Sequence, residues 1–113
     1  MKQSLNQRVE ALLKPKSVAI VGVSGDPSRI GGQLLKYLLK FGYEGTIYPI
    51  NPNYKEVEGI KCYGTIADLP GPVDAAMIAT PEKAVIDSLQ ECAQGGVKSA
   101  IVYSAGFAET GDE

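Results

Sequence analysis

The chain has 113 residues, 44% of them hydrophobic and 21% charged, and its formal net charge is −2. This length and balance predict one globular domain and exclude the general attraction to nucleic acid or membranes that a highly charged chain would show. No apolar run approaches the roughly 20 residues of a membrane helix, and residues 1–16 lack a signal-peptide core, so we expect a cytoplasmic protein without nucleic-acid or membrane partners.

The first half of the chain predicts two helices that alternate with strands. Apolar residues recur at helical spacing over residues 4–13, which predicts a short amphipathic helix. An unbroken apolar run over Val18–Val23 predicts a buried strand. A second helix is expected over about Pro27–Phe41, with Asp26 as its N-cap and Gly42 as its stop, because proline suits the first helical position. Its expected buried stripe is Ile30, Leu34, Leu35, Leu38 and Leu39.

The second half of the chain continues the alternation. Apolar runs predict strands over Thr46–Ile50, Val73–Ala79 and Lys98–Tyr103. Residues 53–71 are rich in glycine and proline and predict turns, whereas Pro81 opens a helix that a pair of glycines ends. Strands that alternate with helices form a parallel sheet. The expected fold is therefore α/β and Rossmann-like, a parallel sheet of about four strands with helices on both faces.

The C-terminal residues 105–113 predict the loop and first turn of another helix. Their acidic residues Glu109, Asp112 and Glu113 suit the amino end of a helix. A doubly wound domain usually adds that helix and one more strand. We therefore expect residues 1–113 to be one domain, truncated at its C-terminus, from a longer multidomain chain.

The residue types exclude several kinds of catalysis. The chain contains no histidine, so Ser-His and Cys-His nucleophiles, histidine metal sites and a phosphohistidine are all excluded. Cys62 and Cys92 lack the spacing of a metal site and are expected to be free thiols. We predict no catalytic residue and no metal site in this chain.

The segment Gly22–Gly31 joins the first strand to the helix that follows it, and its sequence is rich in glycine and serine. Backbone N–H groups at a helix start form a ready phosphate site when they follow a buried strand. This favours a phosphorylated, nucleotide-like ligand. Two alternatives stay open: the glycines serve only close packing, and Arg29 is either a phosphate partner or a solvated side chain.

Three further loops meet this one, because loops after parallel strands converge on the carboxyl edge of a sheet. They are Asn51–Lys55, Thr80–Pro81 and Ser104–Gly106. Two of them also have explanations without a ligand. Thr80–Pro81 suits a helix N-cap with proline in the first turn, and Asn51–Pro52 suits a plain turn. Tyr54 is a candidate for stacking on an adenine ring, although a packing role is the simpler interpretation.

The sequence departs from the dinucleotide-binding fingerprint G-x-G-x-x-G. That pattern requires glycine at the positions of Ser24 and Pro27, and it requires an acidic residue after the second strand. Asn51–Pro52 stands there instead. An NAD-binding domain of a dehydrogenase is therefore a lower-ranked alternative.

Four motifs in order resemble a different family. They are Leu13–Gly22, the pattern G-x-S-x-x-P-x-x-x-G over Gly22–Gly31, Asn51–Pro52 after the second strand, and Ser104–Phe107 after the fourth. Together with the Gly59–Pro70 segment, they resemble the N-terminal CoA-binding domain of NDP-forming acyl-CoA synthetases, relatives of the succinyl-CoA synthetase α subunit. The resemblance covers nearly the whole chain.

The resemblance implies that CoA or acyl-CoA lies across these loops. The phosphates would face Ser24, Gly25 and the helix start, and the pantetheine arm would approach residues 104–106. Family members commonly carry lysine directly after Asn-Pro, where Asn53 stands here and Lys55 follows two residues later. The candidate ligand-binding residues are Gly22, Ser24, Gly25, Pro27, Arg29, Ile30, Asn51, Pro52, Lys55, Thr80, Pro81, Ser104, Ala105 and Gly106.

The resemblance also implies partners. The complete enzyme would convert acid, CoA and nucleoside triphosphate to acyl-CoA, nucleoside diphosphate and phosphate. A phosphohistidine and ATP-grasp parts on downstream domains or on a partner subunit would perform that chemistry, while this chain only binds. An alternative is the CoA-binding regulatory domain of a GNAT-type protein acetyltransferase.

Overall fold

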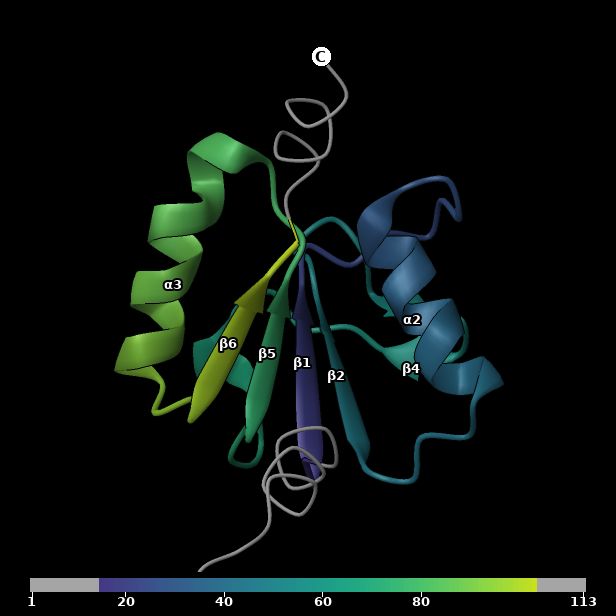
Figure 1. Cartoon of the computed structure of the whole chain (residues 1–113), viewed down its shortest axis with the longest axis horizontal. Coiled ribbons are helices and arrows are strands. Elements are labelled where there is room, and N and C mark those ends of the chain that lie inside the picture. Colours follow the sequence, from purple (N-terminus) through teal and green to yellow (C-terminus); the bar gives the residue numbers. More distant parts are fainter. Residues whose placement is uncertain (1–14, 104–113) are drawn as a thin grey trace, which may run out of the picture.

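Strand β1 (Ser17–Val21) lies in the middle of a parallel sheet, because all five of its residues are small or apolar and buried. The computed structural model describes residues 15–103. In it β1 pairs with β2 (Thr46–Ile50) on one side and with β5 (Ala75–Ile78) on the other, and β6 (Ser99–Val102) pairs with the free side of β5 (Figure 1). The strand order is β2-β1-β5-β6, and every pair is parallel.

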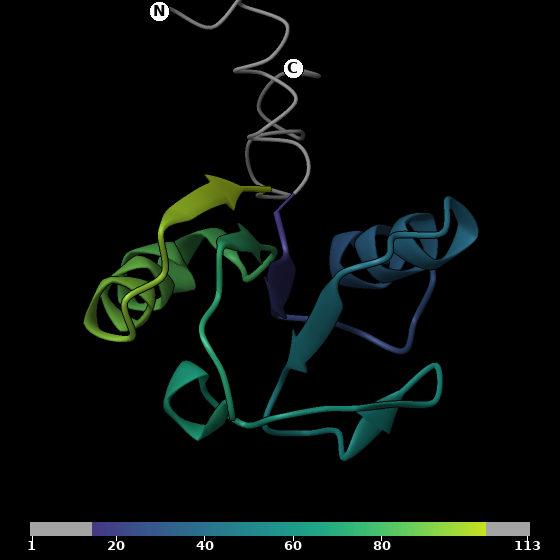
Figure 2. The same ribbon diagram turned by 90° about the horizontal axis from the view of Figure 1, so that it is seen from below.

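This strand order reverses direction between β1 and β5. The chain leaves β1 through helix α2 (Ile30–Lys40) toward one edge of the sheet, and it leaves β5 through α3 (Val85–Gln94) toward the other edge. Because parallel crossovers are right-handed, opposite directions place the two helices on opposite faces, as Figure 2 shows. The reversal also sends the chain after β1 and the chain after β5 to opposite faces of the sheet, which leaves a crevice at the carboxyl edge.

Between β2 and β5 the chain forms a small excursion below the sheet edge (Figure 2). Strands β3 (Glu56–Val57) and β4 (Ile60–Lys61) form a hairpin, and the 3₁₀ helix η1 (Ile66–Asp68) follows. The two-residue turn of the hairpin holds Glu58 and Gly59 at φ of +54° and +79°, as a tight hairpin turn requires. Val57 of the hairpin packs with the α2 core.

The sheet separates two hydrophobic cores. On the α2 face, Ile20 of β1 packs with Leu35 of the helix, and both are fully buried. On the α3 face, Ile78 of β5 packs with residues of η1 and α3. Cys62 lies in the first core and Cys92 in the second, and both are free thiols. Burial raises the pKa of each thiol, so neither is a reactive thiolate.

The predicted α/β fold is confirmed, but the strands are shorter than predicted. The run Val18–Val23 ends as a strand at Val21, since Gly22 turns the chain with a φ of +89°. The predicted strands over Val73–Ala79 and Lys98–Tyr103 shorten to β5 and β6. The strand over Thr46–Ile50 has the predicted bounds.

The predicted start of helix α2 is wrong. Arg29 is its N-cap residue, and neither Asp26 nor Pro27 belongs to the helix. The carboxylate of Asp26 accepts hydrogen bonds from the Ser28 N–H (2.9 Å) and hydroxyl (2.8 Å), while its carbonyl accepts from the Arg29 N–H (3.0 Å). Asp26 therefore closes a separate turn before the helix, as an Asx-turn does. The predicted buried stripe is also partly wrong, because Leu39 is 42% exposed.

The predicted glycine stops are confirmed at both helices. At the end of α2, the Gly42 N–H donates to Leu39 and the Tyr43 N–H donates to Leu38, and Gly42 has a φ of +68°. Gly96 (φ +75°) and Val97 repeat the same pattern after α3. This is the Schellman motif, in which a left-handed residue satisfies the last helical carbonyls.

Some expectations fall on residues outside the described range 15–103. They are the helix over residues 4–13, the Ser104–Gly106 loop and the helix start after residue 105. Within the described range, no helix combines the length and the apolar character that a membrane span needs.

Asp74, just before β5, predicts a pH dependence of the fold. Its carboxylate accepts the Lys16 N–H (2.8 Å) and lies 3.5 Å from the Lys98 ammonium, and these contacts, the Lys16 N–H first, hold the pKa of Asp74 below its ordinary value. A lowered folded pKa contributes stability above the unfolded pKa, and this stability is lost as the pH falls through the folded pKa. We expect Asp74→Asn to lower the Tm at neutral pH.

The difference in Tm between the wild type and Asp74→Asn should narrow as the pH falls below the ordinary pKa of an aspartate, about 3.9, and through the lowered pKa of Asp74, because the carboxylate then becomes protonated. Circular dichroism melts over this pH range measure it. Two melting curves that stay equally far apart at every pH would contradict the role given to Asp74.

Candidate functional site

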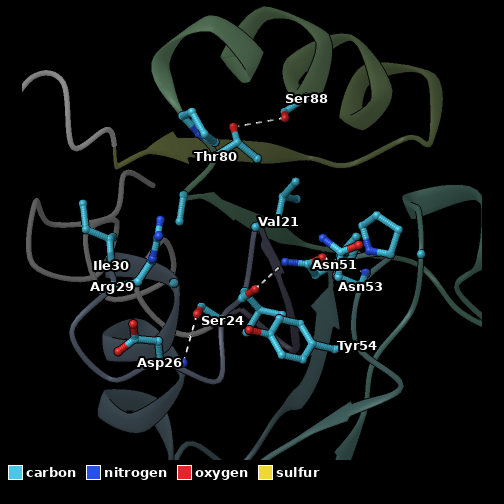
Figure 3. Close-up of a pocket in the computed structure, with 18 of the residues that line it drawn as sticks. Val21, Ser24, Asp26, Arg29, Ile30, Asn51, Asn53, Tyr54, Thr80 and Ser88 are labelled. Atoms are coloured by element: carbon cyan, nitrogen blue, oxygen red, sulfur yellow. Dashed lines mark hydrogen bonds between the residues drawn. The ribbon is translucent and has the colours of Figure 1, made fainter.

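A cavity of about 960 Å³ lies at the carboxyl ends of β1, β2 and β5, where the strand order reverses (Figure 3). This is the position at which open α/β sheets bind ligands, and the volume is at the upper end of ligand pockets, which span about 300–1,000 Å³. Its walls come from the three loops after these strands and from α3. The lining residues with polar groups at their side chains are Ser24, Asp26, Ser28, Arg29, Asn51, Asn53, Tyr54, Thr80, Ser88 and Glu91.

Gly22 fixes the point where β1 passes into the first loop. Its N–H and that of Val23 both donate to the Ile50 carbonyl, at 2.9 and 3.2 Å. A Cβ at Gly22 would lie 3.0 Å from the backbone of Ala79 and Thr80. The β1 and β5 loops therefore approach each other closely here, and the backbone conformation itself favours glycine.

Two further glycines bring the amino end of α2 against the same loop. A Cβ at Gly31 would lie inside van der Waals contact with the Gly22 carbonyl oxygen, and one at Gly32 would clash with the Asp26 carbonyl oxygen. Ile30 and Gly31 both line the cavity. Within residues 15–103, no hydrogen bond occupies the N–H groups of Ile30, Gly31 or Gly32.

The amino end of α2 is therefore built to receive an anion. The unpaired N–H groups of Ile30 and Gly31 and the positive end of the helix dipole meet at one wall of the cavity. Arg29 adds a guanidinium to this wall, and it is the only lysine or arginine among the described lining residues. Figure 3 shows the Arg29 and Ile30 side chains together on this side.

Ser24 and Asp26 shape the loop before the helix. The Ser24 hydroxyl accepts a hydrogen bond from the Asp26 N–H (3.0 Å). Hydrogen bonds from Ser28 hold the pKa of the Asp26 carboxyl below its ordinary value. The Asp26 carboxylate is thus engaged within its own loop, where it stays ionised at neutral pH.

Asn51 connects the β2 loop to the β1 loop. Its side-chain Nδ2 donates to the Val23 carbonyl (2.8 Å), and its Oδ1 accepts the Asn53 N–H (2.9 Å). Both polar atoms of the side chain are therefore used within the protein. Asn51 positions the cavity wall, and its carbonyl, which accepts the Tyr54 N–H (3.2 Å), continues the turn.

Tyr54 completes the wall on this side. Its ring lies over Gly25, since a Cβ there would be 3.5 Å from the ring, and the side chain is 37% exposed. Hydrogen bonding from the Ser24 side chain and then from the Gly25 backbone lowers the pKa of the Tyr54 hydroxyl. In Figure 3 the ring of Tyr54 points from the β2 loop toward Ser24.

The opposite wall comes from the β5 loop and α3. The hydroxyls of Thr80 and Ser88 are 3.3 Å apart, and the Ser88 hydroxyl donates to the Ala84 carbonyl (2.9 Å). Because Ser88 has one hydroxyl proton, Thr80 is the donor of the pair. The prediction of Thr80 as a helix cap with Pro81 in the first turn is wrong: Pro81 is the N-cap of the 3₁₀ helix η2 (Glu82–Ala84), and no side chain caps it.

The structure brings many of the predicted site residues together. The predicted site residues that line the cavity are Gly22, Ser24, Arg29, Ile30, Asn51, Pro52, Thr80 and Pro81. Gly25, Pro27 and Lys55 do not line it, and Ser104, Ala105 and Gly106 lie outside the described residues. Sequence reasoning did not assign Ser88 and Glu91, although their spacing of three places them on one helix face.

Comparison with known proteins agrees with this geometry. The profile of the family described as "CoA binding domain" matches residues 16–111. The chain belongs to the CoA-binding domain family. It is 44% identical over 109 residues to the α subunit of acetate–CoA ligase (ADP-forming) I from Pyrococcus furiosus, covering 93% of this chain and 24% of that one.

Other relatives of this CoA-binding domain are also much longer than this chain. A trans-feruloyl-CoA synthase from an unknown prokaryotic organism is 43% identical over 96% of this chain and 15% of its own length. The solved dinucleotide forming acetyl-coenzyme A synthetase 1 of Ca. Korarchaeum cryptofilum has a TM-score of 0.82 at 45% identity, covering 93% of this chain and 23% of that one. The domain therefore spans less than a quarter of the length of these relatives.

The same fold also occurs in a chain of similar length. A hypothetical protein from Pyrococcus horikoshii OT3 has a TM-score of 0.74 at 28% identity, with 99% of this chain and 85% of that chain covered. The fold is therefore found both as a small part of a long chain and as most of a short one.

Proposed function

We propose that the chain binds CoA or acyl-CoA in the cavity at the carboxyl edge, with the diphosphate of the ligand at the amino end of α2. The observation that carries the proposal is the pair of N–H groups at Ile30 and Gly31, which line the cavity beside the Arg29 guanidinium and have no hydrogen-bond partner within residues 15–103. A diphosphate is an anion that such a wall stabilises through hydrogen bonds and the helix dipole.

The other walls fit the remaining parts of the ligand. The β2 loop, with Asn53 and Tyr54, offers an amide and an aromatic ring for the adenosine. The β5 loop, with Thr80, borders the middle of the cavity. The pantetheine arm would then run toward Ser104–Gly106, which follow β6 at the same edge of the sheet.

The larger role of the domain is also a proposal. Two relatives described above carry names of CoA ligases or synthases, and the chain has no histidine. We infer that it supplies the CoA site of an NDP-forming acyl-CoA synthetase, and that a phosphohistidine and nucleotide-binding parts elsewhere, on further domains or a partner subunit, perform the reaction. Two free thiols in the cores suit the reducing cytoplasm that this role implies.

The end of β2 disfavours the NAD alternative. A dinucleotide site needs a carboxylate there to hold the ribose hydroxyls. Asn51 occupies that place, and its amide is bonded to the Val23 carbonyl and to the Asn53 N–H. No observation favours an acetyltransferase context over a ligase context.

Thermal unfolding tests the proposal. A ligand at about 100 times its Kd stabilises the native state by about 2.7 kcal/mol, which raises the Tm of a domain of this size by about 10 °C. We expect this rise with CoA and with acetyl-CoA, and no comparable rise with NAD at equal concentration. Stabilisation by NAD, with CoA without effect, would refute the proposal.

A further inference from the structure

The charges that line the cavity lie unevenly. Its one described lysine or arginine, Arg29, lies at the amino end of α2, next to the unpaired N–H groups. Its two carboxylates are Asp26, in the loop before that helix, and Glu91, on α3. The cavity therefore has one wall that attracts anions, and its described side chains carry one positive and two negative charges.

The wall formed by the β2 loop has no charge at all. Asn51, Pro52, Asn53 and Tyr54 line it, and none of them is ionised at neutral pH. The Asn51 amide is already bonded within the protein, as is the Asn53 N–H. This wall therefore offers the side-chain amide of Asn53 and the ring of Tyr54, but no cation.

Lys55 does not change this count. It is not among the lining residues, and its carbonyl accepts the Cys62 N–H (2.9 Å), which ties its backbone to the hairpin beside the cavity. Residues 104–113, which follow β6, contain no lysine or arginine either. The described lining residues therefore supply no second cation.

CoA carries two separate phosphate groups: the diphosphate, and a monophosphate on the 3′ oxygen of its ribose. We propose that this cavity recognises only the diphosphate, so that dephospho-CoA, which lacks the 3′-phosphate, binds about as tightly as CoA. This inference rests on the proposed function. A second phosphate beside the uncharged lining residues of the β2 loop meets no cation among the described lining residues.

Calorimetric titration of the full chain with CoA and with dephospho-CoA tests the inference. We expect the two Kd values to agree within about threefold, which is less than 1 kcal/mol. The variant Asn53→Lys should then tighten CoA about tenfold and leave dephospho-CoA unchanged, because a lysine there adds a cation for the 3′-phosphate. The backbone N–H that binds Asn51 is kept in this variant.

Two control variants accompany Asn53→Lys. Asn53→Met matches the length of lysine without its charge and should leave the ratio of the two Kd values unchanged. Lys55→Ala should leave it unchanged as well. If Lys55→Ala weakens CoA but not dephospho-CoA, Lys55 holds the 3′-phosphate and the inference is wrong.

The outcomes separate the inference from the proposed function. If the wild-type chain binds CoA more than about tenfold more tightly than dephospho-CoA, the inference is wrong and the proposed function still stands. The inference is also wrong if Asn53→Lys changes the Kd values of CoA and dephospho-CoA equally, or changes neither, because the 3′-phosphate then lies elsewhere. If neither ligand binds the wild-type chain, the proposed function itself fails.

Discussion

Replacing Gly31 with alanine is expected to destabilise the domain by at least about 2 kcal/mol, as overpacking of a close contact does. The new Cβ would collide with the Gly22 carbonyl oxygen and lie 3.0 Å from the Val23 Cα. Both are backbone atoms at the end of β1, so they cannot rotate away as a side chain could. Alanine is otherwise the better helix former, so a loss of stability has a steric origin.

The same substitution should abolish the thermal stabilisation by CoA. Relief of the clash requires the amino end of α2 to move away from the β1 loop, and the unpaired N–H groups move with it. Urea unfolding gives the change in stability, and melts with and without CoA give the change in binding.

Gly25→Ala is the matched control for Gly31→Ala. A Cβ at Gly25 would meet only the ring of Tyr54, at 3.5 Å, which is an ordinary van der Waals distance. We expect a stability within about 0.5 kcal/mol of the wild type. Equal stability of the Gly31 and Gly25 variants would show that α2 does not depend on the close approach at Gly31.

The sheet was predictable because its signals are local. The run Val18–Val21 is apolar and rich in β-branched residues, and Thr46–Ile50 lies between turn-forming residues. Each of these patterns depends on neighbours in sequence alone. The glycine stop at Gly42 is equally local, since the Schellman motif closes within six residues.

The start of α2 was not predictable in this way. Asp26 followed by proline is a common helix start, yet here its side chain bonds Ser28 and closes a separate turn. The helix begins at Ile30 because Gly31 and Gly32 can approach the loop after β1 closely. That approach is a tertiary contact, and tertiary contacts override local capping preferences.

The sequence was sufficient to predict which loops form the site, but not which side chains face the cavity. Parallel strands bring their following loops to one edge, so Ser24, Asn51 and Thr80 could be placed together from sequence. Which side chains face the cavity depends on bonds between loops, such as the one from the Asn51 amide to Val23. Glu91 lines the cavity because α3 packs across this edge of the sheet, and no local sequence pattern encodes that packing.

Ser24→Asp is expected to weaken CoA binding about 100-fold while the domain stays folded. A carboxylate about 5 Å from a phosphate charge costs about 3 kcal/mol at an effective dielectric constant of about 20, and tenfold in Kd corresponds to about 1.4 kcal/mol. The fold should persist because the Ser24 hydroxyl accepts the Asp26 N–H and a carboxylate oxygen accepts such a bond equally well, and it can also accept the Tyr54 hydroxyl in place of the bond that Ser24 makes there. Calorimetric titration measures the Kd, and thermal melts without ligand measure the fold.

Ser24→Asn is the control, because asparagine has the shape of aspartate and an oxygen that can accept the same N–H. It should weaken CoA by less than about fivefold, since it adds no charge. The difference between the two variants therefore isolates the electrostatic effect of an anion in the loop. If both variants unfold, the loop serves packing alone. If both fold and bind CoA as the wild type does, the diphosphate does not lie at this end of α2, and the amino end of the helix is not its site.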